Sequence, residues 1–223
     1  MFTGGANEDS VRDIIAKVRG AAVEHGRKSD DVRFVVQGGV VVGRTPEEAR
    51  AKLAEYQRHA SIDGVLAYAS LPFDPTAHPP ETPLKELVSE ENFGYFRRFG
   101  IDKSVGELLS SFSDLAAGPF FVCGTPEVVA DEIERWLDDI GIDGINLRQY
   151  HSFDTARDFI ELVVPALRER GRLRKNYVEG ESLRDRIFGA GDRLPEHHHG
   201  TRYRGGAHLP AAERAALAEP TSS

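Results

Sequence analysis

The part of the chain that most constrains its fold is residues 120–147, FFVCGTPEVVADEIERWLDDIGIDGINL. An apolar run at residues 120–122 predicts a short strand. Thr125 and Pro126 then suit the N-cap and the first position of a helix. At the N-cap the threonine hydroxyl can accept a hydrogen bond from a backbone N–H of the first turn. Proline has no backbone N–H, but at the first helical position that N–H would have no partner within the helix. The sequence therefore predicts a strand that leads directly into a capped helix.

The same stretch predicts where the helix ends and where the chain goes next. Apolar residues recur at helical spacing, at Val129, Ile133, Trp136 and Ile140. Gly141 supplies a stop signal, and residues 144–147 predict a second strand. Since a helix of this length carries the chain back along a sheet, we expect the two strands to be parallel neighbours in an α/β fold.

The N-terminal part of the chain predicts more elements of the same kind. Residues 2–3 suit the end of a strand, and the apolar spacing over residues 11–22 predicts a helix. Residues 33–37 predict another strand, with a tight bend at the two glycines that follow, Gly38 and Gly39.

The middle of the chain is less regular. Thr45 and Glu48 have capping-box spacing, so a helix should begin there. Residues 64–68 suggest a short strand, and residues 71–83 carry five prolines and predict an irregular excursion. Residues 103–116 predict the helix that returns the chain to residue 120.

Two motifs in order carry a family resemblance. The run G-T-P-E-V-V-A at residues 124–130, followed by D-G-I-N-L at 143–147, resembles the end of the barrel in the bacterial-luciferase-like flavin monooxygenases. The closest likeness is to the nitrilotriacetate and dibenzothiophene-sulfone monooxygenase branch. The run D-F-I-E-L-V-V-P at 158–165 is similar to the final helix of that branch. Residues outside these runs also match it, namely Leu167, Arg170, Gly171, Tyr177 and the Ser182-Leu183-Arg184 segment.

The residues themselves predict a final helix over 153–170. Its buried face should consist of Ala156, Phe159, Ile160, Val163 and Leu167. Pro165 should kink this helix, because its ring removes one backbone hydrogen bond.

The resemblance implies the C-terminal part of a (β/α)8 TIM barrel, an α/β fold, but an incomplete one. A closed barrel has eight strands and typically about 250 residues, and fewer strands are expected here. We expect residues 1–171 to form a partial luciferase-like barrel with an irregular insertion around 69–102. Residues 172–223 should be a C-terminal extension with a disordered end. In the family the strand at residues 2–3 is longer and follows earlier barrel strands, so the chain is expected to start in mid-fold.

Charge and composition exclude several classes of protein. The net charge of −8 and pI of about 5.5 argue against a nucleic-acid groove or an anionic membrane surface. No apolar run approaches the roughly 20 residues of a membrane-spanning helix. The single cysteine excludes an intrachain disulfide and fits a reducing cytoplasm.

Active sites of such barrels lie at the C-terminal ends of the strands. The residues expected to contact an FMN cofactor there are Thr3, Gly4, Gln37, Gly38, Asn146 and Arg148. Backbone amides at such turns favour a phosphate or the edge of a flavin ring. Two alternatives stay open: the glycines serve only to make turns, and Arg148 forms a salt bridge to Asp154.

Two further features carry no site. Cys123 has no histidine in a partnering motif, so it is expected to be a small buried apolar residue. His197, His198 and His199 are adjacent on a tail and would not converge on one metal ion. We therefore predict no metal site.

By resemblance, the function is that of an FMN-dependent two-component monooxygenase, of which this chain is a C-terminal fragment. It would take reduced FMN (FMNH2) from a separate flavin reductase, use O2 as co-substrate and act on a small organic substrate. In the family, the residues that grip most of the flavin precede this region. The rival hypothesis is a non-catalytic half-barrel, either a truncated gene product or a subunit that completes another chain's barrel, as a homo-oligomer or with the missing N-terminal half. A deazaflavin-dependent oxidoreductase fits the fold but not the tail from D-G-I-N-L to R-Y-R.

Overall fold

The computed structural model describes residues 1–5, 7–69, 71–96, 100–189, 191, 193–194, 198, 200–201, 203, 209–210 and 213. The chain divides into two units, Met1–Leu173 and Arg174–Ser223. The second unit contains α10 (Leu183–Phe188), whose N-terminus is capped by Ser182. Glu181 lies beside it and accepts hydrogen bonds from Arg174 and Arg186, at 2.6 and 3.2 Å.

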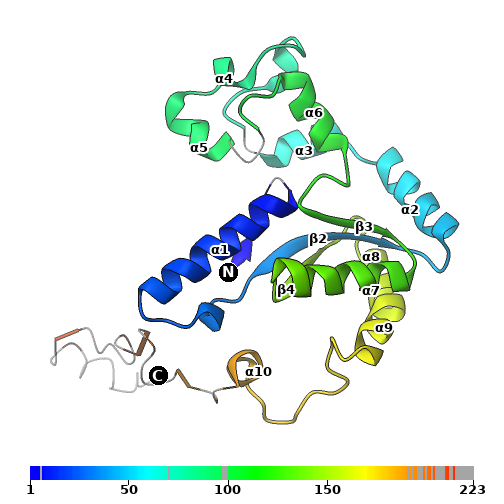
Figure 1. The fold of residues 1–223 in the computed structure, drawn as a ribbon. Coiled ribbons are helices and arrows are strands. Elements are labelled where there is room, and N and C mark those ends of the chain that lie inside the picture. The colour runs from blue at the N-terminus through cyan, green and yellow to red at the C-terminus, as the bar shows by residue number, and fades with distance from the viewer. Residues whose placement is uncertain are drawn as a thin grey trace, which may run out of the picture. The chain divides into compact units, whose positions relative to one another are not determined.

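A parallel four-stranded sheet lies at the centre of the first unit (Figure 1). Its strands are β1 (Phe2–Thr3), β2 (Val35–Val42), β3 (Phe120–Gly124) and β4 (Gly144–Arg148). Residues 35–36 of β2 pair with both β1 and β4, and residues 38–39 pair with both β3 and β4. Since each residue of a strand has two edges, β1 and β3 share one edge of β2 and β4 occupies the other.

The expectation that β3 and β4 are neighbours was therefore wrong, because β2 lies between them. Consecutive strands are adjacent in only about two-thirds of cases, and here Asp143 directs β4 elsewhere. Its carboxylate accepts the backbone N–H of Phe34 at 2.8 Å and pairs with Arg33 at 2.8 Å. Its own N–H donates to the Phe34 carbonyl at 2.8 Å. These contacts attach the start of β4 to the start of β2.

The hydrophobic core covers one face of the sheet. Side chains alternate between the two faces of a strand, and Val36, Val40 and Val42 of β2 point to this core. Ile145 and Leu147 of β4 pack against the same core. The helices that complete it are α1 (Glu8–Glu24), α7 (Pro126–Arg135) and α9 (Val164–Glu169), together with two π-helical turns, η4 (Trp136–Ile140) and η5 (Phe159–Val163).

Gly38 and Gly39 lie inside β2 and do not bend it, so the expected turn was wrong. A methyl group at Gly38 would collide with Ile145 on the core face and lie 3.2 Å from Phe120. A methyl group at Gly39 would collide with the Tyr150 hydroxyl and lie 3.0 Å from Phe121. The glycines are thus needed because neighbouring side chains approach the strand from both faces.

The α7 helix ends as its sequence indicates, and its expected apolar residues Val129, Ile133, Trp136 and Ile140 are all buried. Thr125 is the N-cap and Pro126 the first helical residue, but the Thr125 side chain makes no capping hydrogen bond, so the expected role of its hydroxyl was wrong. After Arg135 the helix widens into η4, and Gly141 closes it with a φ of 82°.

The helix predicted over residues 153–170 differs more from its prediction than α7 does. It consists of α8 (Asp154–Asp158), then η5, then α9. Val163 and Leu167 are buried as expected, but Ile160 is 61% exposed. A π-helical turn adds a residue to the turn, so it shifts the buried face relative to a uniform helix. The break in helical pattern directly precedes Pro165.

The segment between α2 (Pro46–Arg58) and β3 forms short helices around a small core of its own. They are α3 (Ile62–Ala69), η2 (Pro75–Ala77), α4 (Leu84–Leu87), η3 (Glu90–Asn92), α5 (Phe93–Phe96) and α6 (Val105–Ser113). The strand expected at residues 64–68 is helical, because α3 packs against α6 and no strand of the sheet pairs with it. Leu84, Val105 and Leu108 are the buried residues of this core.

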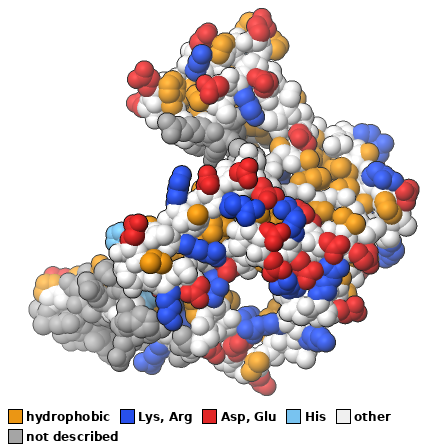
Figure 2. All heavy atoms as spheres, in the orientation of Figure 1, with side chains coloured by type: hydrophobic (Ala, Val, Ile, Leu, Met, Phe, Trp, Pro, Cys, Tyr) orange, Lys and Arg blue, Asp and Glu red, His pale blue; other side chains and the backbone are white. Residues whose placement is uncertain are grey.

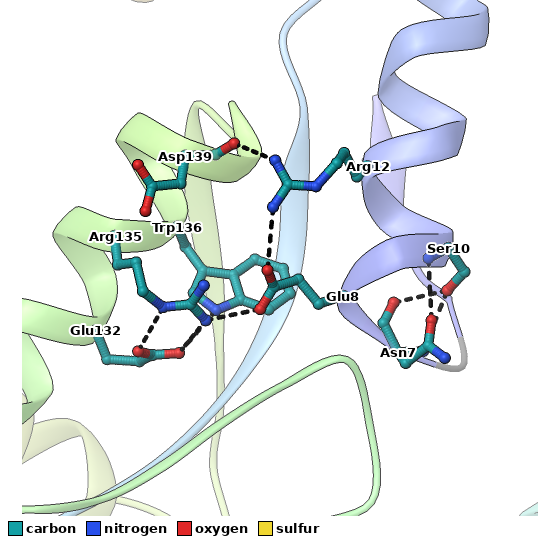
Figure 3. Close-up of polar contacts among 8 residues, drawn as sticks. All are labelled: Asn7, Glu8, Ser10, Arg12, Glu132, Arg135, Trp136 and Asp139. Atoms are coloured by element: carbon teal, nitrogen blue, oxygen red, sulfur yellow. Dashed lines mark hydrogen bonds and ion pairs between the residues drawn. The ribbon is translucent and has the colours of Figure 1, made fainter.

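An ionic network joins α1 to α7 (Figure 3). Arg135 pairs with Glu132 and with Glu8 of α1, each at 2.8 Å. The Trp136 indole N–H donates to Glu132 at 2.9 Å, and Arg12 of α1 donates to the Asp139 carbonyl at 2.6 Å. We call these residues the α1–α7 clamp. Figure 2 shows acidic and basic side chains interleaved over the same region of the surface.

Candidate functional site

Three of the six predicted cofactor residues lie together on the face of the sheet opposite the core. Gln37 of β2 is aligned with Asn146 of β4, and Gly39 with Arg148. Aligned residues of neighbouring strands point to the same face, and so do residues two apart in one strand, such as Asn146 and Arg148. The three polar side chains therefore share one face of the sheet. Gln37 and Asn146 are exposed, and Arg148 is partly buried. We call Gln37, Asn146 and Arg148 the polar column.

The other three predicted residues are not part of this column. Thr3 is aligned with Val36 and so points to the core; it is 9% exposed, and its Oγ1 has no hydrogen-bond partner. Gly38 also points to the core, where Ile145 leaves no room for a side chain. Gly4 is exposed, and a methyl group there would contact nothing within 4 Å.

Tyr150 completes the site, and it was not among the predicted residues. Its ring lies against Gly39, and its hydroxyl donates a hydrogen bond to the Leu115 carbonyl at 2.7 Å. The Phe121 ring meets it edge-on, with 6.4 Å between the centroids, and Tyr56 of α2 stacks on it at 6.2 Å. Burial raises the pKa of the Tyr150 phenol above its ordinary value, and the nearby Arg148 charge opposes this only in part.

A signal for Tyr150 was present in the sequence. It is an aromatic residue three positions after the predicted strand at 144–147, at the C-terminal side of the strand, where barrel sites lie. The sequence did not show which residue the ring packs against, because Gly39, which leaves space for it, is 111 positions earlier in the chain.

Arg148 does not form the salt bridge that was the alternative to a ligand role. Asp154 instead pairs with His151 and Arg157, each at 2.6 Å. The Arg148 guanidinium carbon lies 5.3 Å from the centroid of the Tyr150 ring, a cation–π distance. Arg148 is also within hydrogen-bonding reach of the Tyr150 hydroxyl, so the ring and the phenol oxygen both contact its guanidinium.

A charged cleft of about 600 Å³ lies beside this site, between α2 and α8. Within it Lys52 donates to Asp158 at 2.7 Å, to Glu48 at 3.1 Å and to the Val42 carbonyl at 3.1 Å. Burial would lower the pKa of Lys52, but the hydrogen bonds to Asp158 and Glu48 outweigh it and raise that pKa. Lys52 therefore ties α2 and α8 to the end of β2.

Cys123 is half-buried in the structure and not fully buried as expected. Burial raises the pKa of the Cys123 thiol, which favours the unreactive protonated form. In the described part of the chain, no group of three or more His, Cys, Asp or Glu is placed to hold a metal ion. His197 and His199 lie outside the described residues. None of the described helices combines the length and apolarity that crossing a bilayer requires.

Amides, a guanidinium and aromatic rings on one sheet face define a class of site suited to a planar heterocycle. Side-chain amides offer both donors and acceptors, which matches the alternating carbonyl and N–H groups of a flavin's pyrimidine edge. Tyr150 and Phe121 offer apolar faces beside them. The donor set thus fits the ring of FMN.

Comparison with known proteins identifies the family. Residues 1–144 match the model of the luciferase-like monooxygenase family, and the chain belongs to that family. It is 36% identical over 208 residues to a long-chain alkane monooxygenase of Geobacillus thermodenitrificans, covering 92% of this chain and 43% of that protein. It is 29% identical over 197 residues to component A of nitrilotriacetate monooxygenase from Aminobacter aminovorans, covering 84% and 43%.

Solved structures agree with this assignment. The fold matches the crystal structure of a long-chain alkane monooxygenase with a TM-score of 0.76 and 34% identity, over 91% of this chain and 44% of the other. It matches a riboflavin lyase, solved with modified FMN and riboflavin, with a TM-score of 0.74 and 31% identity, over 91% and 46%. The expected fold, an incomplete luciferase-like TIM barrel, is confirmed. The chain spans less than half the length of these relatives.

Proposed function

We propose that this chain contributes part of the active site of an FMN-dependent monooxygenase that acts on a small organic substrate. The observation that carries the proposal is the polar column beside Tyr150 and Phe121. Family membership supports it, since the relatives named above include two monooxygenases. Arg148 is the last residue of β4, and C-terminal strand ends are where the barrel architecture places ligands, whereas Gln37 lies near the start of β2.

In this proposal the polar column binds the ring edge of the flavin. Gln37 and Asn146 exchange hydrogen bonds with its carbonyl and N–H groups, and Arg148 donates to a carbonyl oxygen. Phe121 and Tyr150 shield one side of the ring from water. When bound, reduced FMN supplies the electrons that activate O2. A flavin reductase on a separate polypeptide would supply it, and a cytoplasmic location is part of the same proposal.

The alternative is that the chain has no activity alone and completes the barrel of another chain, either a second copy or an N-terminal half. One observation favours this alternative. Within the described residues the sheet has four strands, whereas a closed barrel has about eight. The two proposals differ in whether this chain binds FMN by itself, so one binding experiment separates them.

The test is titration of the chain with oxidised and reduced FMN, followed by flavin fluorescence and calorimetry. Asn146→Leu and Arg148→Gln should each weaken FMN binding by about 10-fold or more, because hydrogen bonds to charged or buried groups contribute roughly 1–3 kcal/mol. Arg27→Gln is a matched control, since Arg27 pairs only locally with Asp31 at 3.5 Å. FMN binding that ignores both substitutions would contradict the assignment of the site. No binding by the wild-type chain would favour the alternative.

A further inference from the structure

We infer that Tyr150 is a positioning residue: seated on Gly39, it holds the Arg148 guanidinium in place on the ligand-facing side of the sheet. This inference rests on the proposed function, because it concerns the same site. It gives Tyr150 a second role beside shielding the flavin ring: it sets where the Arg148 cation lies.

The seat of Tyr150 is specific. At Gly39 an added methyl group would collide with the Tyr150 hydroxyl oxygen, and it would lie 3.4 Å from the ring carbon Cζ. The phenol end of the ring therefore lies directly over the strand, where every residue except glycine carries a side chain. The close approach depends chiefly on the hydroxyl, because 3.4 Å is ordinary van der Waals contact.

The ring is held from three other directions. Its hydroxyl donates to the Leu115 carbonyl at 2.7 Å, in the segment that leads into β3. Phe121 meets its edge and Tyr56 stacks on it, with centroids 6.4 and 6.2 Å away. Tyr150 is thus fixed by α2, β3 and the segment before β3, and its orientation does not depend on Arg148.

Arg148, by contrast, is held by Tyr150, through the face of its ring and through a hydrogen bond to its hydroxyl. The guanidinium carbon lies 5.3 Å from the ring centroid. A long arginine side chain loses considerable rotamer entropy when it binds a ligand, and a cation–π contact that orders it beforehand lowers that cost. The fixed aromatic ring therefore acts on ligand binding through the arginine.

Four variants separate the ring from the hydroxyl. Tyr150→Leu removes the ring, Tyr150→Phe removes only the hydroxyl, and Gly39→Ala displaces the tyrosine. In the double variant Gly39→Ala/Tyr150→Phe the colliding hydroxyl is gone, so the ring should return to its seat. Tyr68→Leu is the matched control, since Tyr68 is 89% exposed on α3.

The first readout needs no flavin. The Arg148 Nε–H resonance in NMR should be shifted upfield by the Tyr150 ring current. That shift should persist in Tyr150→Phe, vanish in Tyr150→Leu and Gly39→Ala, and return in the double variant. Tyr68→Leu should leave it unchanged. Thermal unfolding of the same variants reports whether each is folded.

The second readout is FMN affinity. Tyr150→Leu and Gly39→Ala should weaken binding about threefold to tenfold, the range of a partly desolvated cation–π contact. Tyr150→Phe and the double variant keep the ring and lose only the hydroxyl contact to Arg148, so they should weaken binding less. If the wild-type chain binds no FMN, the proposed function fails, and the Arg148 resonance still decides the inference. An unshifted Arg148 signal in the wild type would overturn it. The inference would also be overturned if Gly39→Ala and the double variant Gly39→Ala/Tyr150→Phe weakened FMN binding and the Arg148 shift equally.

Discussion

Adjacent glycines at positions 38 and 39 serve opposite faces of one strand. Gly38 makes room for Ile145 and Phe120 in the core, and Gly39 makes room for Tyr150 on the site face. Their role is steric, since neither residue has a positive φ. Phe153 is the residue where backbone strain does occur: it has a φ of 68° and is 84% exposed, directly before α8.

Two threonines at helix starts should differ in their effect on stability. Thr45 Oγ1 accepts the Glu48 N–H at 3.2 Å, whereas the Thr125 side chain makes no capping hydrogen bond. Thr45→Ala should therefore cost about 1 kcal/mol of unfolding free energy, and Thr125→Ala clearly less. Urea unfolding of the two variants side by side checks this. Equal losses would show that the Thr125 hydroxyl caps α7 in solution.

At the scale of elements, the α1–α7 clamp joins the first helix to the helix after β3. Hydrogen bonds from Arg135 lower the pKa of Glu132, and the Trp136 indole N–H adds to the effect against burial, which raises it. Arg135 likewise lowers the pKa of Glu8. Because both carboxylates are charged in the folded protein, the clamp depends on pH.

The sign of this dependence follows from the lowered pKa values. A carboxylate with a folded pKa below its unfolded value of about 4.3 stabilises the protein fully above that pH. The contribution is lost as the pH falls through the folded pKa, so acid should weaken the clamp below about pH 4. Glu132→Gln should lower stability at pH 7 and reduce its further loss in acid. Chemical unfolding from about pH 3 to 7 measures both, with exposed Glu24→Gln as control. An unchanged pH profile in Glu132→Gln would contradict the assignment.

At the scale of the whole molecule, the sheet of the first unit is open. β3 and β4 each pair with β2 on one side, and the described strands provide no partner for their outer edges. Unpaired edges of a parallel sheet favour association with another chain. The site face carries exposed Gln37 and Asn146, while Tyr150 covers part of the apolar surface beside them.

We expect the chain alone to associate at micromolar concentration. The unpaired edges of β3 and β4 and the exposed Phe2, which is 75% accessible, are the surfaces that would pair. Light scattering and sedimentation over a dilution series should show a mass above that of one chain, with dye binding to apolar surface when the chain dissociates. A compact monomer that binds no dye at any concentration would sink this prediction.

Local sequence signals determined most of the elements. The apolar spacing from Val129 to Ile140, the Thr125-Pro126 start and the Gly141 stop each depend on residues within a few positions of one another. The structure places each at the expected position, although the Thr125 hydroxyl does not cap the helix. The shared face of Gln37, Asn146 and Arg148 was also predictable, because side-chain alternation is a local pattern. The predicted strand end at Gln37 was wrong, since β2 continues to Val42.

Tertiary contacts decided the rest. β4 pairs with β2 because Asp143 binds Phe34 and Arg33, and no periodicity in the sequence encodes which edge of a sheet a strand will join. The glycines at 38 and 39 were read as a bend, because their true neighbours, Ile145 and Tyr150, are more than 100 residues away in the chain. Strand pairing and close packing depend on distant partners, whereas helix starts and stops depend on adjacent ones.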